Sequence, residues 1–569
     1  MFFLHALATK RKKLEEEGDL QGLSKLPFVT VFEKSASPGG VWRSDRSYTN
    51  AGPVPDPHES KEDAVEVAEA KSTNMYEGLW TNGHKDGIEF FDYTFDDHFQ
   101  APLPVYLPRK HVLEYMMARV TKHEDIFQHV QFNTTVQSVS YDDDIAQFVI
   151  TTNKNGISNT STFDKCIWAS GLNGKPKMVE EIQNKLSNFQ GQIVHSSEMD
   201  KLSSDDNAVK GKRILMIGDS FSAEDLALSC IKLGAEKIYI SSRKSEGSAS
   251  YMGSWPEDKV TNLFYSQVSG VKDDGIHRTI VFDALEEDGH IEDAEDVSIV
   301  IFCTGYGANL DFVEEKLLPW TDDDVGVWSM DDTGRGQKDW KMKDNALTDS
   351  LGHVDPSEAL PGNAYYVNAR INRRLLISNP NMMYLHEHGE YPLLDIDIGA
   401  WLCLAYITGE KEMPTKEQML EVNRLDLLNS MHEMGIRYDI DENYMEAWDA
   451  LPDDHWINDT LSSEYRAYYL EDSSYAVRII ARDMVDASYP LQFGNIDELN
   501  EAGEKLLYMM CRSSFGRFDL EKCDEDTKRW KTFRDMDPSP YSSLITGTKS
   551  VPLKGKWLEI DDEGNPTKY

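Results

Sequence analysis

A strand-to-helix turn made of small residues is the clearest chemical signal in this chain. Residues 214–217 are all apolar and predict a buried strand, after which a helix is expected to begin near Ser222. The small residues fill a G-x-G-x-x-G/A pattern, in which backbone N–H groups at the helix start face a pyrophosphate. An ordinary strand-to-helix turn is the alternative. The residues predicted to line a dinucleotide site here are Gly218, Ser220, Phe221, Ser222 and Ala223.

The next predicted strand, residues 237–242, ends at two basic residues, Arg243 and Lys244. Sites for NAD place an acidic residue at this point, whereas cationic groups accommodate the 2′-phosphate of NADP. The pair therefore predicts NADPH as the dinucleotide. A solvated basic pair at a strand end is the other reading.

A second nucleotide site is predicted near the N-terminus. Residues 1–17 have helix-forming composition, Gly18 can end that helix, and residues 28–32 read as a strand that finishes at an acid of the kind that binds adenosine ribose. The preceding strand and glycine loop would lie upstream of Met1, so we expect an incomplete gene model; a protein that lacks this pyrophosphate cradle is the alternative. Residues 38–42 add glycines that let backbone approach a large cofactor closely. The residues predicted to line this site are Glu33, Gly39, Gly40 and Trp42.

Composition narrows the function classes. A chain of 569 residues is too long for one core, so at least two domains are expected. The 99 acidic against 58 basic residues give a formal charge of −41, which argues against binding to nucleic acid or to an anionic membrane surface. The six cysteines are scattered without a CxxC pair, which predicts neither a disulfide scaffold nor a metal site. No apolar run reaches the length of a membrane span, and the cytoplasm is the expected compartment.

Several segments resemble the flavin-containing monooxygenase family, in the order in which that family has them. Residues 189–195 fit its FxGxxxH signature, with Met199 where the family has an aromatic residue. The trimethylamine monooxygenase branch is the most similar, because it shares a Leu-Trp-(Ser/Thr)-Asn-Gly run. The other segments that carry the resemblance are residues 74–83, 92–99, 107–109, 163–171, 300–306, 532–535 and 541–547.

The resemblance implies an α/β fold with two Rossmann-like dinucleotide-binding domains, for FAD and NADP, and a helical C-terminal extension. We expect the first part of the FAD-binding domain, N-terminally incomplete, at 1–185 and an NADPH-binding domain at 186–310. The second part of the FAD-binding domain is expected at 311–412, with an acidic insertion at 320–362. The extension is expected at 413–569, where subunit contacts that form a homodimer are possible.

The resemblance also implies an activity. NADPH and O2 would be used, through a C4a-hydroperoxyflavin, to oxygenate a soft nitrogen or sulfur centre of a small amine or sulfide, as N,N-dimethylaniline and trimethylamine monooxygenases do. Asn82 would be the catalytic residue, hydrogen-bonding near the hydroperoxide, and Thr304 and Gly305 would contact cofactor. His195 is given no general-base role and would link domains. A Baeyer-Villiger ketone monooxygenase and a noncatalytic nucleotide-binding protein remain the alternatives.

One loop departs from the relatives. Residues 379–391 lack the relatives' tryptophan, and an aromatic cage would bind a methylated ammonium through cation–π contacts, so the departure puts trimethylamine in doubt. We expect a polar loop at the flavin edge rather than a zinc site, because no further ligand spacing supports a metal. The polar residues that replace the relatives' loop are His386, Glu387, His388 and Glu390, followed by Asp395 and Asp397.

Overall fold

The computed structural model describes the parts of the chain to which all statements below refer. These are residues 1–43, 74–76, 88–90, 92–100, 107, 109–122, 126–203, 207–219, 221–243, 259–273, 278–285, 291–319, 370–386 and 392–423, with short stretches and single residues elsewhere.

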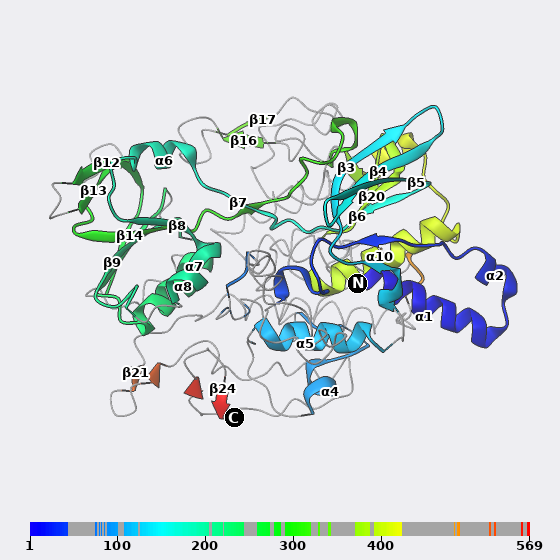
Figure 1. The fold of residues 1–569 in the computed structure, drawn as a ribbon, viewed down its shortest axis with the longest axis horizontal. Helices are drawn as coiled ribbons and strands as arrows, with labels where there is room; N and C mark the ends of the chain where they lie inside the picture. The colour runs from blue at the N-terminus through cyan, green and yellow to red at the C-terminus, as the bar shows by residue number, and fades with distance from the viewer. Residues whose placement is uncertain are drawn as a thin grey trace, which may run out of the picture.

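The elements form two lobes that are joined by a pair of crossing segments (Figure 1). The first lobe is built from residues 1–171 and 311–423, and the second lobe from residues 178–303. The chain passes from the first lobe to the second through β7 (Lys175–Pro176) and returns through β15 (Tyr306–Gly307). These two connecting strands pair in antiparallel orientation, so the outgoing and returning segments brace each other.

A parallel sheet forms the centre of the second lobe, with the strand order β11-β10-β9-β14-β8. Its middle strand is buried on both sides, which explains its uninterrupted apolar sequence. Ile214 and Met216 face α8, while Leu215 and Ile217 face the packing of α6 and the β12-β13 hairpin. The elements of this lobe are α6 (Glu180–Lys185), β8 (Gln192–His195), η4 (Ser196–Glu198), α7 (Met199–Ser203), β9 (Arg213–Ile217), α8 (Phe221–Lys232), β10 (Lys237–Ser241), β11 (Val260–Leu263), β12 (Ser266–Asp273), β13 (Arg278–Ala284) and β14 (Val297–Phe302).

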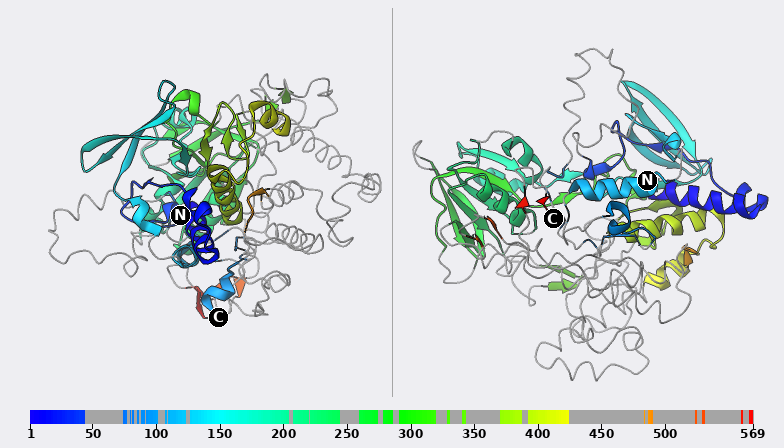
Figure 2. Two further views of the ribbon diagram at one scale, coloured as in Figure 1. Left: turned by 90° about the vertical axis from the view of Figure 1, so that its right-hand side faces the viewer. Right: turned by 90° about the horizontal axis from the view of Figure 1, so that it is seen from below.

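Three helices, α1, α5 and α10, share the main core of the first lobe. The apolar start of α1 is buried against α10, beside which it lies in both views of Figure 2, whereas its charged second half faces solvent. Gly18 ends α1 in the left-handed conformation, with φ of 70°. The elements of this lobe are α1 (Phe2–Glu17), α2 (Leu20–Ser24), β1 (Val31–Phe32), η1 (Gly40–Trp42), α4 (Phe95–Phe99), α5 (Arg109–Val120), η3 (Ile126–His129), β2 (Val130–Gln131), β3 (Thr135–Asp142), β4 (Gln147–Lys154), β5 (Ile157–Phe163), β6 (Cys166–Trp168), η6 (Glu315–Leu317), β18 (Ile371–Asn372), β19 (Leu375–Leu376), β20 (Asn379–Tyr384) and α10 (Pro392–Thr408).

The sheets of the first lobe are smaller. β6 pairs in parallel with β20 in a sheet ordered β18-β19-β20-β6, and β3, β4 and β5 form an antiparallel sheet. The strand expected at 28–32 is shorter than predicted, because only Val31 and Phe32 lie opposite β2. Phe28 is fully exposed, so its apolar character does not reflect burial in a strand.

The expected α/β class with two Rossmann-like lobes is confirmed, and the C-terminal part is described only in pieces. Residues 416–423 are helical. Most of the predicted insertion at 320–362, and most of the extension beyond 423, fall outside the described residues. The pieces that are described there include residues 483 and 486–489 and three antiparallel strand pairs, β16 (Trp328–Met330) with β17 (Trp340–Met342), β21 (Cys523–Asp524) with β22 (Arg529–Trp530), and β23 (Glu559–Ile560) with β24 (Pro566–Lys568).

Among the helices of the described residues, none combines the length and the apolar character needed to cross a membrane.

Candidate cofactor site

The turn after β9 can be made only by glycine. Gly218 has φ of +100°, and a Cβ placed there would lie 2.7 Å from the carbonyl oxygen of Cys303. The backbone N–H of Gly218 donates to the carbonyl of Ser241 at 2.9 Å, so the turn threads between the carboxyl ends of β10 and β14. The start of α8 is thereby placed at the carboxyl end of the central strands, where open α/β sheets bind nucleotides. This geometry fits a bound dinucleotide.

The other residues predicted for this turn are distributed along the first turn of α8. Phe221 begins the helix and Ser222 is half-buried. Ala223 is buried in the core beneath α8, which suits the position where a small residue permits close helix–strand packing. Ser220 lies outside the described residues.

The predicted 2′-phosphate ligand Arg243 lies just past β10 and is exposed; Lys244 falls outside the described residues. The positive charge of Arg243 adds to that of Lys185 in lowering the pKa of Glu181. The end of β10 therefore presents an accessible cation, the requirement for an anionic ligand.

His195 closes β8, and both of its ring nitrogens are occupied. The ring Nδ1 accepts from the backbone N–H of Ser197 at 3.1 Å, so Nε2 carries the hydrogen that is donated to the carbonyl of Gly305, also at 3.1 Å. Burial lowers the pKa of His195, against the opposing effect of the Gly305 carbonyl. A neutral imidazole whose nitrogens are both bonded links β8 to the connecting segment.

Thr304 and Gly305, the cofactor residues predicted from the later motif, lie in the returning segment. The Thr304 hydroxyl donates to the carbonyl of Lys177, and the N–H of Lys177 donates to the carbonyl of Gly305 at 3.0 Å. Gly305 has φ of +78°, a conformation that favours glycine. These residues therefore fix the crossing between the lobes at the end of β14.

The second predicted site lies in the first lobe. Glu33 follows β1, and its carboxylate accepts the N–H of Ser35 at 2.8 Å. Burial lowers the pKa of the Met1 amino group, at the start of α1, while the Glu33 carboxylate raises it, so the two groups interact electrostatically. A helix start beside an acid at a strand end is the arrangement that holds an adenosine diphosphate. The donor set present thus fits part of an FAD site.

The predicted glycine loop beside the flavin is packed against α5. Gly39 has φ of +117°, and a Cβ there would lie 2.9 Å from Cδ1 of Leu113. Gly40 has φ of +55° and begins the short helix η1, which contains Trp42. Both glycines have positive φ, and a side chain at Gly39 would also displace the end of Leu113, so the backbone conformation of this loop favours glycine.

Arg109, which in the sequence stands out only as part of the motif at 107–109, belongs to this site. Its side chain is 3% exposed and donates to three carbonyls: Nε to Trp42 at 3.1 Å, and the two Nη groups to Met75 and Arg43. Its backbone N–H donates to the carbonyl of Leu79 at 2.9 Å. One arginine at the start of α5 therefore ties the glycine loop to the segment that precedes Asn82.

The predicted catalytic residue Asn82 lies outside the described residues. Its neighbour Thr81 is 4% exposed, and it exchanges hydrogen bonds with Leu107, through the Thr81 N–H at 2.8 Å and the Thr81 hydroxyl at 3.0 Å. The chain that leads into the predicted position is thus attached to the segment just before α5.

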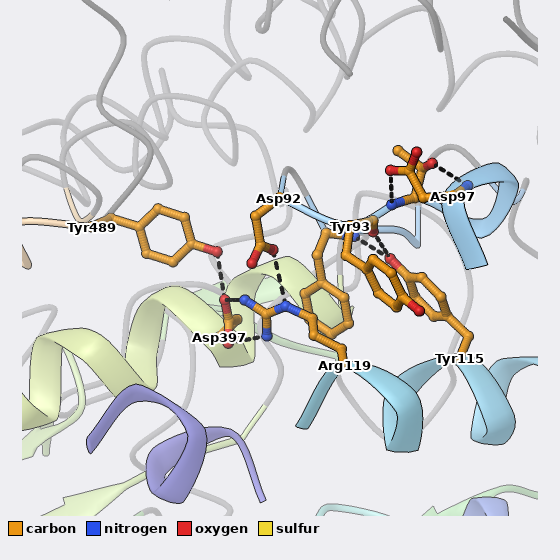
Figure 3. A network of polar contacts seen from close by, with 9 residues as sticks. Asp92, Tyr93, Asp97, Tyr115, Arg119, Asp397 and Tyr489 are labelled. Atoms are coloured by element: carbon orange, nitrogen blue, oxygen red, sulfur yellow. Dashed lines mark hydrogen bonds and ion pairs between the residues drawn. The ribbon is translucent and has the colours of Figure 1, made fainter. Parts of the chain in front are cut away.

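The two aspartates that follow the divergent loop are structural in this chain. Asp397 is fully buried and accepts a bidentate pair of hydrogen bonds from Arg119, at 2.9 and 2.8 Å (Figure 3). Arg119 also donates to Asp92 at 2.9 Å, and the Tyr489 hydroxyl donates to Asp397 at 2.5 Å. Burial lowers the pKa of Arg119, but Asp397 and its neighbours outweigh burial and raise it. This charged group joins α5, α10 and the C-terminal part.

Asp395, two residues before Asp397 in α10, forms a second buried ion pair. It accepts a hydrogen bond from Arg374 at 2.6 Å, and Arg374 also donates to the carbonyl of His386. A Cβ at residue 399 would lie 2.7 Å from Nε of Arg374, so Gly399 makes room for the guanidinium. His386 is buried beside Trp168. Residues 387–390 are outside the described range, and the described His, Cys, Asp and Glu residues include no cluster that could hold a metal.

Comparisons with known proteins agree with this geometry. Residues 62–262 match the family model FMO-like, whose description is 'Flavin-binding monooxygenase-like'. The trimethylamine monooxygenase of Pelagibacter ubique is 32% identical over 306 residues, which cover 53% of this chain and 59% of the relative. The trimethylamine monooxygenase of Methylocella silvestris is 24% identical over 549 residues, covering 95% of this chain and 90% of the relative.

A solved structure has the same fold. The crystal structure of Tmm from Pelagibacter sp. matches with a TM-score of 0.58 at 21% identity, covering 97% of this chain and 95% of that one. The alignments with the Pelagibacter relatives span little more than half of those relatives' length, 59% in each case.

Proposed function

We propose that this chain, a member of the flavin-containing monooxygenase family, uses NADPH and O2 to oxygenate a soft nitrogen or sulfur centre of a small molecule. The observation that carries the proposal is the Gly218 turn, which sets the start of α8 at the carboxyl end of the central strands, where a dinucleotide would bind. The cofactors of the family are FAD and NADPH. The residues of the first lobe match FAD, and those of the second lobe match NADPH.

Each lobe would hold one cofactor with its own residues. In the second lobe, backbone N–H groups from Ser220 to Ala223 would bind the pyrophosphate, and Arg243 and Lys244 would bind the 2′-phosphate. In the first lobe, Glu33 would bind the adenosine ribose, and Gly39, Gly40 and Trp42 would border the flavin ring. Thr304 and Gly305 would hold the crossing segment in place between the two lobes.

FAD, when bound, supplies the redox chemistry between NADPH and O2. The protein orients the partners and excludes water, and Asn82 would donate a hydrogen bond at the reacting edge. The reaction balances as substrate, NADPH, O2 and one proton giving the N- or S-oxide, NADP⁺ and water. If substrate is not oxygenated, the same inputs without substrate give hydrogen peroxide, which makes peroxide release a measure of uncoupling.

The proposed substrate class is a small amine or sulfide, and the trimethylamine monooxygenase relatives support the amine. We also infer that the protein acts in the cytoplasm and forms a homodimer through the C-terminal part. We expect the domain limits 1–185, 186–310, 311–412 and 413–569 to describe the units that carry these functions.

The test is an assay of NADPH oxidation with the FAD-loaded protein and a panel of trimethylamine, dimethylaniline, a thioether and cyclohexanone. We expect ¹⁸O from ¹⁸O₂ in an N- or S-oxide, detected by mass spectrometry. Ester formation from the ketone alone would make the protein a Baeyer-Villiger enzyme. Failure to bind FAD, or NADPH oxidation that yields no oxygenated product with any compound, would refute the proposal.

The dinucleotide assignment is tested separately by Arg243→Ala. Loss of a guanidinium from a 2′-phosphate is expected to raise KM for NADPH roughly tenfold or more, and to leave KM for NADH unchanged. Arg213→Ala is the matched control, because Arg213 begins β9 at the opposite end of the sheet, where it pairs with Glu236 at 2.9 Å. Equal changes with both dinucleotides would exclude a 2′-phosphate contact by Arg243.

A further inference from the structure

A short segment is bonded to both lobes. It comprises the described residues Asn74, Met75, Tyr76, Leu79 and Thr81, here named the strap. On the side of the second lobe, the Tyr76 hydroxyl donates to the carboxylate of Asp225 in α8. The Tyr306 hydroxyl, from the returning crossing segment, donates to the carbonyl of Asn74 at 2.8 Å. The strap therefore meets both α8 and the connection between the lobes.

On the side of the first lobe, the strap is bonded to the start of α5. Arg109 donates through its guanidinium to the carbonyl of Met75 and through its backbone to that of Leu79. The same guanidinium donates to the carbonyls of Trp42 and Arg43, which end the glycine loop. The strap is thus connected through one side chain to the loop that would border the flavin.

The bond between Tyr76 and Asp225 is buried and charge-assisted. Tyr76 is 5% exposed and Asp225 is 9% exposed. Burial, and then the Asp225 carboxylate, raise the pKa of Tyr76 well above its ordinary value, so the hydroxyl stays a donor at every working pH. Hydrogen bonds to a charged acceptor in such surroundings are stronger than neutral ones.

The position of the Tyr76–Asp225 hydrogen bond in the fold connects it with the proposed function. Asp225 lies near the start of α8, the helix whose first turn follows Gly218. Arg109 contacts the loop that contains Gly39 and Gly40. The strap consequently runs from the helix that would hold the dinucleotide phosphates to the loop that would border the flavin.

We propose that Tyr76, Asp225 and Arg109 are positioning residues, which through the strap hold the dinucleotide helix of the second lobe in register with the flavin loop of the first. The inference rests on the proposed function for its catalytic consequence, while its structural part does not. Simple core packing is the competing explanation, because the Tyr76 ring also lies in the apolar cluster beneath α8.

Tyr76→Phe separates these explanations, since it keeps the ring and removes only the hydroxyl. We expect amide hydrogen exchange in peptides covering residues 74–81 to speed up roughly tenfold to a hundredfold, the equivalent of losing a hydrogen bond to a charged group. Asp225→Asn keeps an acceptor for the hydroxyl and is expected to fall between the wild type and Tyr76→Phe. Tyr239→Phe is the matched control, because Tyr239 is also buried in the second lobe but its hydroxyl interacts with Arg213 and the backbone of Glu295.

In the FAD-loaded enzyme, Tyr76→Phe should release several-fold more hydrogen peroxide per NADPH oxidised and raise KM for NADPH, while KM for the oxygenated substrate changes little. Exchange and coupling at wild-type values in Tyr76→Phe would overturn the proposal, as would equal effects in Tyr239→Phe. If the wild type shows no NADPH-dependent oxygenation, the proposed function fails, and the exchange experiment alone still decides whether the strap joins the lobes. Unchanged exchange together with normal wild-type activity would refute the strap and leave the function standing.

Discussion

At the scale of single residues, the buried ion pair of Arg119 gives a structural reason for Asp397, one of the aspartates that follow the divergent loop. Its guanidinium is 2% exposed and lies 4.0 Å from the Phe90 ring centroid, between the carboxylates of Asp92 and Asp397. A buried ion pair is not more stabilising than apolar packing in general, but removal of one partner is costly. Asp397 therefore belongs to the scaffold, and any effect of the divergent loop on substrate choice must come from residues before α10.

Burial of His111 makes the stability of the folded protein sensitive to acid. Burial, with Lys110 and His98, lowers the pKa of His111 to about 4. Between pH 6.5 and 4 the unfolded chain then binds a proton that the folded chain does not, so stability falls as the pH falls, by up to about 3 kcal/mol at pH 4. His111→Phe keeps an aromatic ring packed near Phe99, and it should remove the part of the stability loss at low pH that His111 causes.

Urea unfolding at pH 4, 5, 6 and 7 measures the effect. From pH 7 to pH 4, the stability of the wild type relative to His111→Phe should fall by up to about 3 kcal/mol, because only the wild type carries a side chain here that gains a proton on unfolding. Parallel stability curves over the whole range would show that His111 does not titrate with folding.

At the scale of elements, local pattern explains what the sequence could predict. The apolar run of β9, the glycine turn and the helix ended by Gly18 depend on neighbours within a few residues, and the structure has them where they were expected. The prediction of a strand at 28–32 was only partly correct, because strand pairing depends on a partner strand far along the chain. The Tyr76–Asp225 and Arg119–Asp397 pairs join positions 149 and 278 residues apart, so no spacing rule could find them.

The Gly218 turn permits a sharp test of one element. Gly218→Ala must accept a φ of +100° and a Cβ 2.7 Å from a backbone carbonyl, so we expect a loss of about 2–4 kcal/mol in the free energy of unfolding and weaker NADP⁺ binding. Gly211→Ala is the control, since Gly211 has φ of +66° with no atom near its Cβ, and should cost about 1 kcal/mol. Urea unfolding and NADP⁺ titration report the two effects; equal losses in both variants would mean that the close approach to Cys303 is not limiting.

At the scale of the whole molecule, strand pairing and polar side chains join pieces that are distant in sequence. The β7-β15 pair and His195 brace the crossing between lobes, and the strap adds a second connection. The C-terminal part is attached to the first lobe in the same way. Arg373, in the turn between β18 and β19, donates to Asp483 at 2.8 Å and to Asp486 at 2.5 Å.

This attachment predicts how the C-terminal part responds to mutation. Arg373→Gln removes a cation shared by two carboxylates, of which Asp483 is 5% exposed, and should cost about 2–4 kcal/mol. Lys411→Gln removes only the partly exposed 3.0 Å contact with Asp486 and should cost less than about 1 kcal/mol. Because the lost bonds are those between the first lobe and residues 483–486, limited proteolysis of Arg373→Gln should cut near these residues sooner than in Lys411→Gln. A double-mutant cycle with Asp483→Asn should give a coupling above about 1 kcal/mol, and additive losses would mean that the ion pair does not attach this part of the chain.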